Sequence, residues 1–184
     1  MLFTKKGDDG TTKTFGCDQR MSKSSIIAEA LGALDETNSY LGFCKLKSRE
    51  KDFNFSDNFS FEKIIHDIQK NLFIIQAEIA GAKNSMTKEK VEELENFVNN
   101  IEKELPEIKS FFIAGGTDLA VTFDVARTVS RRAERRVIAV VDEEKVSVGE
   151  STKAYLNRLS SFLYACARLA NHRAGISEES PDYK

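Results

Sequence analysis

The chain is poor in proline and histidine and has no tryptophan, and these shortages limit what the protein can be. Two prolines, Pro106 and Pro181, occur in 184 residues, and long stretches without proline favour long helices. The two histidines, His66 and His172, provide too little imidazole for a typical catalytic zinc centre. The sequence therefore indicates a helical protein, and we expect no zinc centre built from its side chains.

Cysteine is also scarce. Cys17, Cys44 and Cys166 are odd in number, lie far apart and form no Cys-x-x-Cys pair, so neither a disulfide framework nor a zinc site is indicated. A reducing cytosol is the expected compartment. No apolar run approaches the roughly 20 residues that span a bilayer, and the first residues lack the features of a signal peptide or an arginine-rich leader. We therefore expect a cytoplasmic protein outside the membrane.

Neither sign of charge is in large excess. The net charge is −2 and the isoelectric point is about 5.8, which argues against general affinity for nucleic acids or membranes. Hydrophobic residues make up 41% of the chain and charged residues 30%, as in soluble helical proteins. At this length we expect one domain over residues 1–184, with a flexible acidic tail over residues 176–184.

The N-terminal segment is the most informative part of the sequence. Residues 4–16 contain three glycines, four threonines, three lysines and two aspartates. Glycines let backbone N–H groups approach a ligand closely, and threonine hydroxyls and lysine ammonium groups bind phosphate. We interpret residues 1–22 as a loop that wraps a triphosphate, with Asp8 and Asp9 as candidates for holding a divalent cation. A frayed polar terminus is the alternative.

Apolar residues recur at helical spacing in five segments, over about 26–43, 60–81, 87–105, 117–141 and 150–175. Residues 48–60 are predicted to form a polar connection. Residues 111–116, an apolar run that ends in a glycine pair, are predicted to form an extended loop leading into the fourth helix. Because the links are mostly short, we expect an all-α fold, a five-helix antiparallel bundle preceded by the phosphate-binding loop.

The fourth helix contains a concentration of arginine. Arg127, Arg131, Glu134 and Arg135 share one face, at positions i, i+4, i+7 and i+8. Five arginines outweigh one glutamate within residues 127–136, and arginine favours bidentate recognition of anions or ion pairs at interfaces. A solvated face with Glu–Arg pairs is the alternative. Nucleic-acid binding is a third interpretation, but the chain lacks the wide basic surface and the stacking aromatic side chains for it.

The fifth helix carries a polar row at positions i, i+4, i+7 and i+11, formed by Asn157, Ser161, Tyr164 and Arg168. This row either lines a site or faces water.

Taken together, five segments of the sequence resemble the PduO-type ATP:cob(I)alamin adenosyltransferases. They occur in the family's order, span nearly the whole chain and cover residues 4–12, 29–39, 111–116, 126–136 and 155–160. The resemblance implies a homotrimer of five-helix bundles with active sites between subunits. It also implies transfer of the 5′-deoxyadenosyl group of ATP to the cobalt of cob(I)alamin, forming adenosylcobalamin and releasing triphosphate. Ala114 stands where the family usually has proline.

The resemblance further implies roles for individual residues. One subunit would wrap the phosphates with Thr4, Lys5, Lys6, Gly7, Thr12, Lys13 and Lys23. The neighbouring subunit would meet ATP with Arg131, Arg132, Glu134, Arg135 and Asn157. The residues implied in catalysis are Arg131, Phe112 facing the corrin, and Asp35 with Arg127 as an intersubunit ion pair. The small molecules implied are ATP, Mg²⁺ and cob(I)alamin, and the implied protein partners are a cobalamin reductase and an adenosylcobalamin-dependent acceptor enzyme.

Two other functions remain open from the sequence. A non-catalytic nucleotide sensor or cobalamin chaperone would use the same ATP site without producing adenosylcobalamin. A helical nucleic-acid-binding or scaffold protein would use residues 127–136, and would show salt-dependent binding to oligonucleotides.

Overall fold

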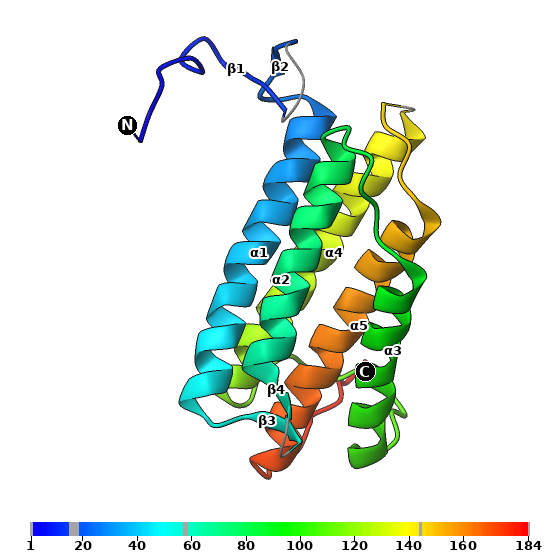
Figure 1. The fold of residues 1–184 in the computed structure, drawn as a ribbon. Coiled ribbons are helices and arrows are strands. Elements are labelled where there is room, and N and C mark those ends of the chain that lie inside the picture. Colours follow the sequence, from blue (N-terminus) through cyan, green and yellow to red (C-terminus); the bar gives the residue numbers. More distant parts are fainter. Residues whose placement is uncertain (1, 15–18, 57–58, 144, 184) are drawn as a thin grey trace.

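The computed structural model describes residues 2–14, 19–56, 59–143 and 145–183. This part of the chain forms the helices α1 (Ile26–Glu50), α2 (Phe61–Ile79), α3 (Lys88–Glu104), α4 (Asp118–Asp142) and α5 (Glu150–Arg173). Consecutive helices alternate in direction along the bundle (Figure 1). α1 packs against α2 and α4, α4 packs against α5, and α3 lies along α5. The predicted five-helix antiparallel bundle is therefore confirmed.

The described residues also form two short antiparallel hairpins. β1 (Thr11–Thr12) pairs with β2 (Met21–Ser22), and β3 (Asn54–Ser56) pairs with β4 (Phe59–Ser60). The first hairpin and the N-terminal loop project beyond the start of α1, at one end of the bundle (Figure 1). The second hairpin lies within residues 48–60, which the sequence predicted only as a polar connection.

The first helix is longer than its sequence pattern predicted. The pattern ended near Phe43, but α1 continues to Glu50. Cys44 and Ser48 lie one turn apart and are both buried, so the core-facing stripe continues although the residues between them are largely charged. Ser48 Oγ donates a hydrogen bond to the Cys44 carbonyl at 2.8 Å, which satisfies the hydroxyl inside the helix. Asp52 then adopts a left-handed backbone, with φ of 47°, of the kind that ends helices.

Large aromatic side chains fill the centre of the bundle. Phe61, Phe123 and Phe162 are fully buried, and Tyr155 is 1% exposed. Burying each such side chain stabilises the fold by about 1.5–3 kcal/mol. Within the described residues, no helix is both long enough and apolar enough to cross a membrane.

The start of α5 is capped by a residue from another helix. Gly149 stands at the cap position of α5 and has no side chain to offer. Glu78 of α2 takes that role: its Oε1 accepts from the Gly149 N–H at 2.8 Å, and its Oε2 accepts from Thr152 Oγ1 at 2.5 Å. The carboxylate thus satisfies a free N–H at the positive end of the helix dipole.

The C-terminal tail lies against the connection between α3 and α4. The Ile113 N–H donates to the Glu179 carbonyl at 2.8 Å, and the Ser110 and Ser180 hydroxyls are 2.6 Å apart. The flexibility expected for residues 176–184 stays a prediction, but these contacts give the described tail a defined place.

Candidate functional site

A groove lined by basic and acidic side chains runs between α4 and α5. Arg131, Glu134, Arg135 and Asn157 line it, in a space of about 320 Å³. Asn157 Nδ2 donates to Glu134 Oε1 at 3.1 Å. Over the described residues, neither Arg131 nor Arg135 forms an ion pair. The groove therefore presents two guanidinium groups that remain available to an anion.

A larger groove of about 680 Å³ adjoins the first. Phe112, Arg127 and Tyr164 line it, and Arg131 lines both grooves and so joins them. Arg127 Nε lies 3.0 Å from Asp124 Oδ1, and its guanidinium lies 5.7 Å from the centre of the Tyr164 ring. Burial raises the pKa of the Tyr164 hydroxyl, so this residue stays a neutral donor near neutral pH.

The N-terminal loop folds on itself ahead of α1. Lys23 Nζ donates to the Gly7 carbonyl at 2.7 Å, and the Lys23 N–H donates to the Gly10 carbonyl at 2.9 Å. A Cβ at Gly7 would lie 3.0 Å from Lys23 Nζ and 3.2 Å from the Thr11 carbonyl oxygen, so a larger residue would crowd the loop. The other phosphate candidates lie exposed or half-buried on the same loop: Thr4, Lys5, Lys6, Thr12 and Lys13.

Arg20 holds this loop together, and the sequence analysis did not identify it. Its Nε donates to Thr11 Oγ1 at 2.5 Å, and its Nη2 donates to the Thr11 carbonyl at 3.0 Å. Nη2 also donates to the Lys6 carbonyl and lies 3.4 Å from Asp9 Oδ1. A single arginine among polar residues shows no spacing pattern that would have revealed this role.

Asp9 is already engaged inside the loop. Its Oδ1 accepts from the Thr11 hydroxyl at 2.7 Å and from the Thr11 N–H at 2.9 Å. These hydrogen bonds, together with Arg20, hold the pKa of Asp9 below its usual value. The described residues include no group of three His, Cys, Asp or Glu side chains able to hold a metal ion.

Some of the expected partners do not meet within one chain. The hydrogen bonds of Lys6, Gly7 and Thr11 go to residues within the N-terminal loop and to residues 20–23. Asp35 is exposed on α1, while Arg127 pairs with Asp124. Arg132 points toward α1 and forms an ion pair with Glu36, away from the groove that Arg131 and its neighbours line.

The members of the polar row on α5 lie in different environments. Ser161 and Tyr164 line the larger groove. Arg168, in contrast, is 4% exposed and forms an ion pair with Glu178 in the tail. Whether this row serves a functional site stays a prediction.

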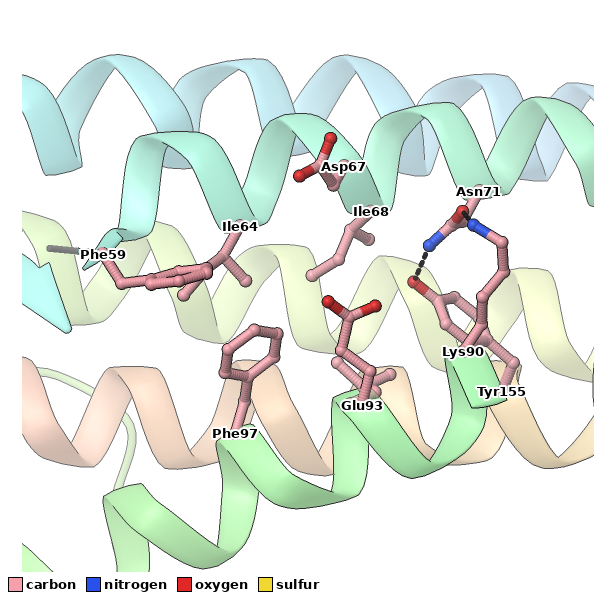
Figure 2. A pocket seen from close by; sticks show the side chains of 10 residues that line it. Phe59, Ile64, Asp67, Ile68, Asn71, Lys90, Glu93, Phe97 and Tyr155 are labelled. Carbon is pink, nitrogen blue, oxygen red and sulfur yellow. Dashed lines mark hydrogen bonds between the residues drawn. The ribbon is translucent and has the colours of Figure 1, made fainter. Parts of the chain in front are cut away.

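A third, much smaller cavity lies between α2 and α3 (Figure 2). Its volume of about 20 Å³ has room for about one water molecule. Asn71 Nδ2 donates to the Tyr155 hydroxyl at 3.0 Å, and Lys90 Nζ donates to Asn71 Oδ1 at 2.5 Å. None of the expected site residues lines it, so we assign this polar cluster to the core.

Comparisons with known proteins identify the family of this chain. The family profile described as Cobalamin adenosyltransferase matches residues 2–170. The corrinoid adenosyltransferase of Bacillus subtilis (strain 168) is 35% identical over 184 residues, covering 96% of this chain and 90% of that protein. The corrinoid adenosyltransferase PduO of Citrobacter freundii is 33% identical over 180 residues, covering 94% of this chain and 50% of that protein.

A solved structure shares the whole fold. A variant of the PduO-type ATP:corrinoid adenosyltransferase from Lactobacillus reuteri, complexed with cobalamin and ATP, superposes with a TM-score of 0.86 at 26% identity. The superposition covers 100% of this chain and 97% of that one. Fold and sequence together define an adenosyl-transferring enzyme built as a helical bundle. The chain belongs to the cobalamin adenosyltransferase family, in its PduO-type branch. It is an ATP:corrinoid adenosyltransferase that forms adenosylcobalamin, as the five sequence segments predicted.

Proposed function

We propose that ATP binds where Arg131 joins the two grooves of one subunit, with its triphosphate wrapped by the N-terminal loop of a neighbouring subunit. One observation carries this proposal: Arg131 and Arg135 line the groove and form no ion pair with any described residue. Glu134, which lies between them in the sequence, is hydrogen-bonded to Asn157 instead. Two such guanidinium groups suit a polyanion. Glu134 and Asn157 offer polar atoms to the nucleoside. Arg132, tied to Glu36, contributes charge from outside the groove.

The chemistry needs little from the protein beyond binding and positioning. The substrate cob(I)alamin is the nucleophile: a cobalt–carbon bond forms at C5′ of the ribose, the C5′–O bond breaks, and its electron pair leaves with triphosphate. No protein nucleophile or general base takes part. Arg131 and the loop lysines neutralise the charge on the leaving group, and the two grooves hold C5′ in line with the cobalt.

Phe112 takes the corrinoid side of the site. It is half-buried, and it lines the larger groove with Arg127 and Tyr164. An apolar ring at this position excludes water and the nucleotide tail of cobalamin from the lower face of the corrin. It thereby favours the corrinoid form without a lower axial ligand, which is easier to reduce from Co(II).

A homotrimer completes this site. The outer faces of α1 and α4 expose apolar side chains, with Phe43 59% and Val121 43% exposed, and Asp35 lies on the same face of α1 as Phe43. Apolar surface next to a charge suits a contact between copies. Asp35 of one subunit would pair with Arg127 of the next. Light scattering on the purified protein should give three times the chain mass, and a monomer would contradict the intersubunit site.

Mg²⁺ would accompany ATP rather than the free protein. Asp9 is occupied by Thr11 and Arg20, so phosphate oxygens and water would supply most of the ligands of the ion. In the cell we place the enzyme in the cytosol. There, a cobalamin reductase would supply the reduced corrinoid and an adenosylcobalamin-dependent enzyme would accept the product.

The deciding experiment is an anaerobic assay. Purified protein is mixed with ATP, Mg²⁺ and chemically reduced cob(I)alamin, and the visible spectrum is followed. We expect an ATP-dependent, light-sensitive spectrum of adenosylcobalamin. ATP binding without product would favour the nucleotide sensor or cobalamin chaperone, and salt-dependent oligonucleotide binding without ATP binding would favour the nucleic-acid-binding alternative.

A further inference from the structure

Arg168 connects three parts of the chain that are far apart in sequence. It lies on α5, and its side chain is 4% exposed. Its Nε donates to both carboxylate oxygens of Glu178 in the tail, at 2.9 and 3.2 Å. Its Nη2 donates to the Pro106 carbonyl, just after α3, at 3.1 Å. A buried guanidinium needs such a carboxylate and such acceptors, because an unpaired charge is costly to bury.

The same guanidinium lies against Phe112, with its central carbon 5.1 Å from the centre of the ring. Phe112 lines the larger groove together with Arg131. It also lines a separate groove, formed by the connection after α3 and the C-terminal tail, together with Arg168 and Glu178. The ring therefore stands between the two grooves. A cation over one face of an aromatic ring is attractive, most of all where water is excluded.

The loop that carries Phe112 has little else to fix its position. No helix or strand covers residues 105–117, and Ala114 leaves the backbone without the restraint of a proline ring. Asn171 anchors the far end of the loop, donating to the Gly115 carbonyl at 2.9 Å and accepting from the Thr117 N–H at 3.0 Å. Near Phe112 itself, the described contacts come from Arg168 and the tail.

We propose that Arg168 is a positioning residue for Phe112, and that Glu178 keeps the Arg168 guanidinium against the ring. This proposal rests on the corrinoid-facing role of Phe112 given above. Through Phe112, Arg168 acts on the corrinoid half of the reaction and leaves ATP binding unchanged. The C-terminal tail thus contributes to the site through one carboxylate.

The chain offers a matched control for this role. Arg173, five residues further along α5, also pairs with a glutamate, Glu104, at 2.7 Å, and its guanidinium also lies over a phenylalanine ring, Phe53, at 5.2 Å. Phe53 lines neither of the two grooves that Phe112 lines. Arg168→Lys and Arg173→Lys therefore make the same chemical change at a functional and at a structural position.

The experiment compares the two variants in steady-state kinetics with corrinoid and with ATP. For Arg168→Lys we expect turnover from cob(II)alamin, with a reductant present, to fall about tenfold or more, and turnover from pre-reduced cob(I)alamin to fall less. KM for ATP should stay within about twofold of wild type. Arg173→Lys should leave all three values near wild type. An equal loss with both corrinoids, or a matching rise in KM for ATP, would overturn the proposal.

A double-mutant cycle tests whether Arg168 acts through Phe112. In a Phe112→Ala background, Arg168→Lys should have no further effect on turnover from cob(II)alamin, because its target is absent. Additive losses would refute the positioning role. Glu178→Gln keeps a hydrogen-bond acceptor in the tail, and it should also lower turnover from cob(II)alamin more than turnover from cob(I)alamin, to a smaller degree. This second variant tests the proposal even where Arg168→Lys folds poorly. A wild-type protein without any adenosyl transfer would contradict the proposed function itself, whereas unaltered kinetics in both Arg168→Lys and Glu178→Gln would contradict only this inference.

Discussion

Asn157 on α5 donates a hydrogen bond to Glu134 on α4 over 3.1 Å, across the groove between the two helices. The bond orients the Glu134 carboxylate toward α5. Arg131 and Arg135, one turn apart on α4, consequently form no ion pair with any described residue. The excess of arginine over glutamate in α4 is visible in the sequence. It is Asn157 on α5, however, that binds Glu134 and so leaves these arginines available.

Replacing Arg131 with alanine should abolish most adenosyl transfer and leave the fold intact. Arg131 is exposed, so its removal leaves no cavity, while the loss of a charge that stabilises the leaving group should lower kcat by about 10²–10³-fold. Arg136→Ala is the control, because Arg136 lies on the same helix, is also exposed and pairs with Glu29 at 3.7 Å. Anaerobic spectroscopy measures the rate and light scattering the assembly. Turnover of Arg131→Ala equal to that of Arg136→Ala would remove Arg131 from the site.

Replacing Arg20 with alanine should weaken ATP binding without unfolding the bundle. The Arg20 guanidinium contacts Thr11, Lys6 and Asp9, so its removal should leave the loop less ordered in the free protein. Because the loop must then become ordered each time ATP binds, KM for ATP should rise about tenfold. Arg20→Lys should restore only part of the affinity, because lysine lacks the fork of donors. Arg49→Ala, which removes a surface pair with Glu62 at 3.9 Å, should bind ATP as wild type does. Unchanged KM in Arg20→Ala would show that the loop is not organised by this residue.

The sequence predicted the helices well because apolar residues repeat at helical spacing along each of them. The end of α1 was missed because small or polar residues, Cys44 and Ser48, continue its buried stripe, and neither is strongly apolar. The β3–β4 hairpin was missed because it is stabilised by packing of Phe53 and Phe55 against Phe61, with ring centres 4.4 and 5.7 Å apart. Such contacts depend on tertiary structure and leave no periodic pattern in the sequence.

The candidate site was predictable only in part. Arg131, Glu134 and Arg135 share a face by helical geometry alone, and Asn157 joins them only through the packing of α4 against α5. Arg132 follows Arg131 directly, but the helix turns it toward Glu36 on α1. Whether it still contributes to ATP binding stays a prediction. Residues that are neighbours in the sequence thus point to different sides of a helix, and only three-dimensional contacts reveal which of them share a groove.

Replacing Glu78 with alanine should destabilise the whole bundle. Glu78 is 7% exposed and accepts hydrogen bonds from the Gly149 N–H and from Thr152 Oγ1, which is itself fully buried. Its loss leaves both donors without their partner and removes the cap of α5, so the free energy of unfolding should fall by about 1–3 kcal/mol. The surface variant Glu92→Ala, which breaks an i,i+4 pair with Lys88, should cost less than about 0.5 kcal/mol. Urea unfolding curves measure both values, and equal costs would contradict the capping role.

The pair of Glu104 and Arg173 should make part of the stability depend on pH. Both carboxylate oxygens accept hydrogen bonds from the Arg173 guanidinium, at 2.7 and 2.8 Å, and these bonds hold the pKa of Glu104 below its ordinary value of 4.5. A carboxyl with a lowered folded-state pKa stabilises the protein fully above its unfolded-state pKa, and this contribution is lost as the pH falls through the lowered value.

Because the Glu104 side chain is 42% exposed, solvent screening limits the effect of this pair to about 1 kcal/mol or less. Glu104→Gln should therefore be less stable than wild type by a constant amount between about pH 5 and pH 7, and the difference should shrink below about pH 4.5. Added salt should shrink it as well, because the pair is partly in contact with solvent. Urea unfolding of both proteins across this range provides the measurement. A difference that persists unchanged at the acid end would mean that Glu104 stabilises the end of α3 by packing, and not through its charge.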